Sequence, residues 1–188
     1  MFHPSTTPEV LAALESSARD IAAFFSSQPD EVLFTGDPDH WGPAHHLVHL
    51  TRTSAVIERG LRSRTLPRHS TGHSRTYAEV RDAATSSLGA TSRERLLEMG
   101  REVVIGPHPT CAELVQSFLS ASARLREAAM AWSEEDLDRR ALTHPLIGEL
   151  TAREMLLFCV VHERHHLKLV RTRLGQQAHR SPWSPDGR

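Results

Sequence analysis

The sequence of 188 residues lacks an excess of either charge, because 22 basic and 23 acidic residues leave a net charge of −1. Proteins that bind nucleic acids usually carry a basic excess, so we expect no nucleic-acid partner. The sequence also lacks an apolar run of about 18 residues, which a membrane-spanning helix needs, so no membrane partner is expected. Its N-terminus, MFHPSTTPEV, has neither the basic flank nor the apolar centre of a secretory signal.

Cysteine is scarce as well. The two cysteines, Cys111 and Cys159, are too few for a disulfide scaffold, which is typical of proteins in the reducing cytoplasm. We therefore expect a cytoplasmic protein. With 39% hydrophobic residues the chain can build an ordinary core, and its length predicts a single domain.

Histidine, in contrast, is abundant, with 13 residues against a single tyrosine. Six of these histidines fall in two short windows, residues 45–49 and 162–166. Histidine is the commonest metal ligand and titrates near neutral pH. The two windows are therefore the first candidates for a functional site.

Apolar residues recur with helical spacing along most of the chain, and residues typical of helix starts and stops flank the periodic segments. The first predicted helix takes Thr7 as its N-cap, and the last follows the capping box of Thr151 and Glu154 and ends at Gly175. Four long helices are predicted in this way, over residues 8–28, 43–61, 111–132 and 152–175.

The segments between the long helices carry weaker patterns. Residues 62–75 are predicted to be a loop, and short helices are expected at 76–88 and 91–100. We expect no strand in the chain. The predicted fold class is all-α: a four-helix bundle in residues 1–175, with short extra helices between the second and third long helices. Residues 176–188 are predicted to form a disordered tail.

Two pairs of histidines, His45 with His49 and His162 with His166, are four residues apart in predicted helices. Residues four apart on a helix point the same way, so one metal ion can bind between such a pair. This composition gives about one His-x-x-x-His pair by chance, whereas the chain has three. The third pair lies in the 62–75 loop and serves as an internal control.

The last predicted helix places His162 and His166 on the same stripe as its core residues. Two buried imidazoles without partners are costly, so either hydrogen bonds or a metal ion should satisfy them. His49 lies at the edge of the apolar seam of the second helix, where both interpretations stay open. The other histidines of the two windows are expected to be solvated or at the surface: His45, His46 and His165.

Residues 162–166 also read His-Glu-x-x-His, which is the signature of zinc peptidases. That site needs a third ligand, but Leu169 replaces the glycine of the metzincin extension, and no glutamate follows Glu163. Such peptidases also place a sheet beside this helix. A di-iron bundle needs two Glu-x-x-His motifs, and the chain has one. Neither site is favoured.

The two windows together resemble the DinB/YfiT-like family, in which a helical bundle turns three imidazoles inward to bind one divalent metal. The resemblance covers roughly residues 7–175. It rests on these elements: Trp41-Gly42-Pro43, His49-Leu50, Gly148-Glu149-Leu150-Thr151 and His162-x-x-x-His166. It implies a bundle of this type with His49, His162 and His166 as ligands of one zinc, nickel or iron ion. His45 stands where an acidic residue is common, which leaves it open as a fourth ligand or a partner of one.

Members of this family include transferases and isomerases that use a low-molecular-weight thiol, and others described as metal-dependent hydrolases. A three-histidine site keeps the ion electrophilic, which lowers the pKa of a bound thiol or water. The favoured hypothesis is an enzyme that transfers a low-molecular-weight thiol to an electrophilic small molecule. Hydrolysis by metal-bound hydroxide and a non-catalytic metal-binding bundle are the alternatives. The resemblance also makes a homodimer an expectation, because dimers are common among such proteins.

Overall fold

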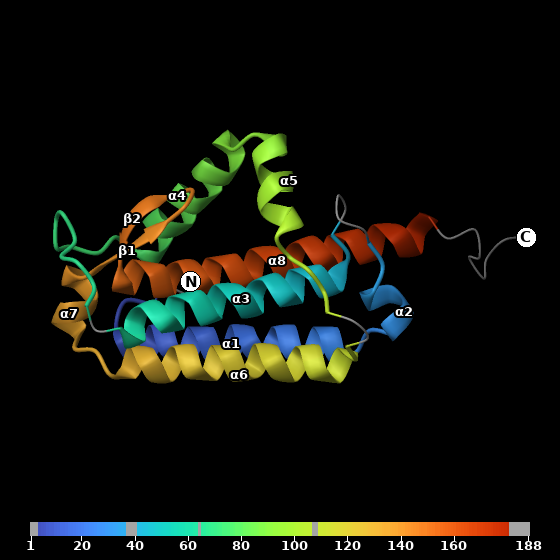
Figure 1. The fold of residues 1–188 in the computed structure, drawn as a ribbon, viewed down its shortest axis with the longest axis horizontal. Coiled ribbons are helices and arrows are strands. Elements are labelled where there is room, and N and C mark those ends of the chain that lie inside the picture. The colour runs from blue at the N-terminus through green and yellow to red at the C-terminus, as the bar shows by residue number, and fades with distance from the viewer. Residues whose placement is uncertain (1–3, 37–40, 64, 107–108, 181–188) are drawn as a thin grey trace, which may run out of the picture.

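The computed structural model describes residues 4–36, 41–63, 65–106 and 109–180, with backbone only for 176–180 (Figure 1). The helices are α1 (Thr7–Ser26), α2 (Asp30–Leu33), α3 (Pro43–Arg62), α4 (Tyr77–Ala90), α5 (Arg93–Arg101), α6 (Cys111–Met130), α7 (Glu134–Arg139) and α8 (Ala152–Arg180). The strands are β1 (Ala141–His144) and β2 (Gly148–Thr151).

The four long helices α1, α3, α6 and α8 lie side by side and form the bundle (Figure 1). Helices α1 and α3 each pack against both α6 and α8, and α4 packs across α8. The predicted all-α four-helix bundle is confirmed, and the short helices α4 and α5 lie in the connection where they were expected. None of the described helices combines the length and the apolar character needed to cross a lipid bilayer.

The start of α1 differs by one residue from the prediction. Thr6, not Thr7, is the N-cap: its hydroxyl accepts the N–H of Glu9 at 3.4 Å, and the Glu9 carboxylate accepts the N–H of Thr6 at 3.0 Å. Both threonines precede Pro8, but only Thr6 has a glutamate three residues later in the sequence. The capping box fixes Thr6, because its glutamate must stand three residues after the cap.

A short antiparallel hairpin contradicts the expectation of no strand. Strands β1 and β2 pair from Ala141 with Thr151 to His144 with Gly148. Gly148 has a φ of +87°, a conformation that other residues rarely adopt. Strands of four residues are too short for an alternating pattern to be recognised in the sequence.

The end of α8 is also further along the chain than predicted. The helix continues past Gly175 to Arg180, and Figure 1 shows its last turns extending beyond the other long helices. Gly175 is not among the glycines with positive φ in the described ranges, so it does not form the left-handed cap that was expected there. Residues 176–180 of the predicted tail are thus helical, and 181–188 lie outside the described residues.

The bundle core consists of two apolar clusters. The hairpin-end cluster includes Leu14, Leu61, Leu125, Leu150 and Leu156. The α2-end cluster includes Ile21, Leu33, Leu47, Phe118 and Val170. Each long helix has residues in both clusters, and one buried polar residue lies between the two sets. We call these four residues the polar layer: Ser17, Ser54, Ser122 and Glu163.

Glu163 is the charged member of the polar layer and is 2% exposed. Neither of its carboxylate oxygens has a hydrogen-bond partner within the described part of the chain. Burial raises the pKa of Glu163 to about 7, and the nearby Ser17 hydroxyl and the charges of Arg164 and Arg126 lower it by less. A carboxyl group in such a place destabilises the fold when it is ionised.

Replacing Glu163 by glutamine should therefore stabilise the protein in a pH-dependent way. The carboxyl pKa is about 7 in the folded protein against an ordinary 4.5, so folded-state stability is lost as pH rises between these values. Glu163→Gln should raise the free energy of unfolding by about 3 kcal/mol above pH 7 and have little such effect near pH 4.5. Urea unfolding of both proteins across this range measures the difference. A difference that does not change with pH would contradict the expectation.

Candidate metal centre

Three histidines from two facing helices come together at the packed surfaces of α3 and α8. His49 is on α3, and His162 and His166 are one turn apart on α8. The ligand nitrogens of all three lie within 4.8 Å of one another. The Nε2 atom of His162 is 3.0 Å from Nε2 of His49 and 2.9 Å from Nε2 of His166. The structure thus brings together the three residues that the family resemblance implied as metal ligands.

The start of α8 is fixed by the capping box that the sequence predicted. The Thr151 hydroxyl accepts the N–H of Glu154 at 3.0 Å, and Glu154 accepts the N–H of Thr151 at 3.1 Å. The same carboxylate binds the guanidinium of Arg75 through Nε at 2.9 Å and Nη2 at 3.0 Å. These contacts set where α8 begins, and therefore which of its residues face α3.

The contacts at His162 show that hydrogen bonds within the triad cannot satisfy it. A single imidazole nitrogen carries either one hydrogen or one lone pair, so the two short contacts at His162 Nε2 cannot both be good hydrogen bonds. A cation accepts a lone pair from each ring. Tetrahedral zinc with Zn–N distances of about 2.0–2.1 Å separates its nitrogens by about 3.4 Å, close to the spacing here. Three neutral imidazoles suit zinc, nickel or iron.

The electrostatic environment keeps these rings neutral. Burial lowers the pKa of His49 to about 4, with smaller contributions from Arg52 and His144. Burial also lowers the pKa of His162 and of His166 well below the ordinary range, and the neighbouring imidazoles lower both further. Their lone pairs are therefore available at neutral pH without competition from protons.

Zinc binding should consequently release few protons from the triad, even in mild acid. At about pH 5.5, three imidazoles with the ordinary pKa of 6.5 would release nearly three protons on binding zinc. With these lowered pKa values the number should be close to zero. Calorimetric titration in buffers of different ionisation enthalpy counts the protons. A release of two or more would show that the rings are protonated before they bind metal.

Trp41 covers one side of the triad. Its ring centroid is 5.0 Å from that of His49 and 6.1 Å from that of His166. The indole N–H donates to the carbonyl of Gly100 at 3.1 Å, and Arg173 donates to the Trp41 carbonyl. On another side the Phe158 ring stacks on His162, with centroids 5.1 Å apart and planes inclined by 20°.

The expectation that His46 lies at the surface is wrong. His46 is 9% exposed, and its Nδ1 atom is 2.8 Å from Nδ1 of His166. The signal for this position was present, because His46 stands four residues before the core residue Leu50 and three before His49. His165, also expected at the surface, is half-buried.

His45 is used differently from the ligands. Its Nδ1 accepts the N–H of Gly42 at 3.2 Å, which caps the start of α3, and the group of residues able to hold a metal does not include it. The prediction that α3 begins at Gly42 and Pro43 is confirmed. We therefore interpret His45 as a capping residue of α3 and not as a metal ligand.

His144 is near the triad and was not identified from the sequence. It ends β1, and its Nδ1 accepts the N–H groups of Leu146 and Ile147, both at 3.2 Å. Its ring centroid is 4.4 Å from that of Phe158, and a charge on it lowers the pKa of both His49 and His162. The hairpin brings it there, and the hairpin itself was not predicted.

Glu163 does not face the triad. Its environment includes Ser17 of α1 and Arg126 of α6, on the interior side of the bundle. A zinc peptidase needs this glutamate beside the metal as general base, so its position agrees with the sequence argument against that site.

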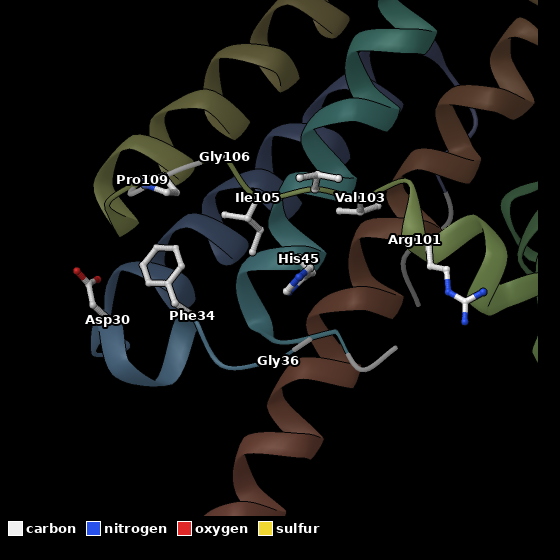
Figure 2. A pocket seen from close by; sticks show the side chains of 10 residues that line it. Asp30, Phe34, Gly36, His45, Arg101, Val103, Ile105, Gly106 and Pro109 are labelled. Carbon is white, nitrogen blue, oxygen red and sulfur yellow. The ribbon is translucent and has the colours of Figure 1, made fainter. Parts of the chain in front are cut away.

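A cavity of about 710 Å³ has His45 among its lining residues (Figure 2). Figure 2 shows Asp30 and Arg101 at opposite sides of it, with His45 between them. The residues around it, many of them apolar, are Asp30, Phe34, Gly36, His45, Arg101, Val103, Val104, Ile105, Gly106 and Pro109. The Trp41 ring stacks on that of His45, which lines the cavity, with centroids 6.5 Å apart, and the same ring approaches His49 of the triad.

The family model described as the DinB superfamily matches residues 13–170. The chain belongs to the DinB superfamily. The matched range contains His49, His162 and His166, so the DinB region includes the complete triad.

Among solved structures, this DinB protein is similar to one described as TT2238, a four-helix bundle protein. The two chains are 20% identical, with a TM-score of 0.58, over 89% of this chain and 99% of that one. At this identity the likeness shows the shared bundle fold. No curated protein matches the sequence.

Proposed function

We propose that this DinB-superfamily protein is an enzyme that holds one divalent metal ion through His49, His162 and His166. We further propose that it transfers a low-molecular-weight thiol to an electrophilic small molecule. The convergence of one ligand nitrogen from each of three imidazoles within 4.8 Å carries the proposal. A bound ion would lower the pKa of a thiol or water enough to give a nucleophile at neutral pH.

The surroundings of the triad support a nucleophile that comes from outside the chain. Cys159, the nearest cysteine along α8, is 2% exposed, and burial together with Glu163 raises its pKa well above the ordinary value. Such a thiol stays protonated and packs as a small apolar group. Thiol delivered as a cosubstrate therefore fits the site better than catalysis by a cysteine of the protein.

The cavity beside His45 supports a small-molecule substrate. Its volume of about 710 Å³ is within the usual range for ligand sites, and its lining combines apolar side chains with a few polar groups. The Trp41 ring approaches both His45 of the cavity and His49 of the triad, so the cavity and the proposed metal site share a neighbouring residue. Metal-dependent hydrolysis would use the same triad without a thiol.

Removing one ligand should abolish metal binding. Protein purified without a histidine tag should contain about one equivalent of divalent metal per chain, and His162→Ala less than about a tenth. Elemental analysis measures both. His73→Ala is the matched control, because His73 is an exposed histidine of the loop before α4 and should leave the metal content unchanged. Equal metal in His162→Ala and wild type would refute the assigned ligands.

The transfer reaction is tested with the metal-loaded protein, an aromatic electrophile and several biological thiols. We expect thiol conjugation with at least one thiol, and its loss after chelation and in His162→Ala, because the triad holds the ion that binds the thiol. His73→Ala should keep the full rate. Ester or amide turnover without thiol would favour the hydrolase instead. No rate above the metal-free protein with any thiol would exclude the transferase.

A further inference from the structure

The contact between His46 and His166 links a buried histidine outside the triad to a partly buried member of it. Their Nδ1 atoms are 2.8 Å apart, which is a hydrogen-bond distance. His46 belongs to the first turn of α3, and His166 to α8, so the contact crosses the same helix interface as the triad. A hydrogen bond here requires one ring to offer an N–H and the other a lone pair.

Metal binding by the triad would determine whether His46 or His166 donates the hydrogen bond between them. His166 directs Nε2 toward His162, so a metal bound there would take the Nε2 lone pair. A neutral imidazole that binds metal through Nε2 keeps its hydrogen on Nδ1. The Nδ1–H of His166 therefore points at His46, whose Nδ1 must accept it.

We propose that His46 is a positioning residue of the metal centre, which accepts the Nδ1–H of His166 and holds that ring with Nε2 toward the ion. The inference rests on the proposed metal binding and adds a residue that acts through a ligand. Metal-bound histidines commonly donate their second N–H to a fixed acceptor, which orients the ring and makes it a stronger ligand. Here the acceptor is another imidazole.

The structure holds His46 firmly enough for this task. Its ring meets the Trp41 ring edge to face, with centroids 5.2 Å apart and planes inclined by 86°. Trp41 is itself anchored by its hydrogen bond to Gly100. His46 meets the Nδ1 side of His166, whereas a metal would bind the Nε2 side, so His46 is not placed as a fourth ligand.

The second nitrogen of His46 can be satisfied without the triad. His46 also lines a cavity of about 540 Å³, together with residues of α8 that include Lys168, Thr172 and Arg173. Water in this cavity can accept the Nε2–H that remains once Nδ1 acts as acceptor. The arrangement assigns each nitrogen of His46 and His166 a distinct partner.

Two substitutions distinguish the role of His46 as a hydrogen-bond acceptor from the role of its ring in packing. His46→Asn places an amide oxygen where Nδ1 stands and loses the ring, whereas His46→Phe keeps a ring and loses the acceptor. The zinc affinity of each protein is measured by competition with a chelator. We expect His46→Phe to bind zinc about 10- to 100-fold more weakly than wild type, and His46→Asn to stay within about threefold.

His165→Phe is the matched control, because the His165 ring lies 5.4 Å from that of His166 and no hydrogen bond joins them. It should bind zinc within about threefold of wild type. Thermal unfolding confirms that each variant folds, and His46→Leu replaces His46→Phe if the larger ring disrupts α3. Nitrogen-detected NMR of the zinc-loaded proteins gives a second readout. It should show a protected Nδ1–H on His166 in wild type and His46→Asn, and faster exchange of this proton in His46→Phe.

The outcomes distinguish this inference from the proposed function. Wild-type protein that takes up no zinc would overturn the proposed metal binding, and the inference with it. Wild type that binds zinc while His46→Phe binds equally well would overturn the role of His46 alone. Weak binding by His46→Asn with normal binding by His46→Phe would do the same, because ring packing rather than the acceptor would then matter.

Discussion

The packing of α3 against α8 is the interaction on which the candidate centre depends. Neither helix supplies a complete site, since α3 contributes His49 and α8 contributes His162 and His166. The same interface brings His46 to His166. A shift of one helix relative to the other by a single turn, about 5.4 Å, would separate every one of these contacts. The capping box of Thr151 and Glu154 and the bond from Arg75 to Glu154 oppose such a shift, because they fix where α8 starts.

Burial gives the centre its chemical character at a cost to stability. It lowers the pKa of the triad imidazoles, which keeps their lone pairs free for a metal. It also removes these polar rings from water, and contacts within the triad cannot satisfy all their nitrogens. In this DinB protein the same property would favour the binding of a metal ion, because an ion accepts lone pairs that contacts within the triad leave unsatisfied. Such a site would gain more from a bound ion than exposed histidines would.

The sequence predicted those features that rest on local or periodic patterns. The apolar spacing located the four long helices, the paired histidines indicated His162 and His166, and the family resemblance added His49. Features that depend on contacts across the chain were missed. His46 is buried because Trp41 and α8 cover it, and His144 approaches the triad because a hairpin too short to recognise carries it there. The predicted end of α8 at Gly175 was wrong for a local reason, because a single glycine can also continue a helix, as it does here to Arg180.

The polar layer has a consequence for how the bundle moves. Ser17, Ser54, Ser122 and Glu163 interrupt the apolar contacts between the hairpin-end and α2-end clusters. Proteins open locally in cooperative units, and a break in the core is where two such units can meet. Two of the triad histidines, His162 and His166, stand within one turn of Glu163 on either side. An ion bound between α8 and α3 beside the polar layer would link the two helices there. It would thereby couple the opening of the hairpin-end half of the bundle to the opening of the α2-end half.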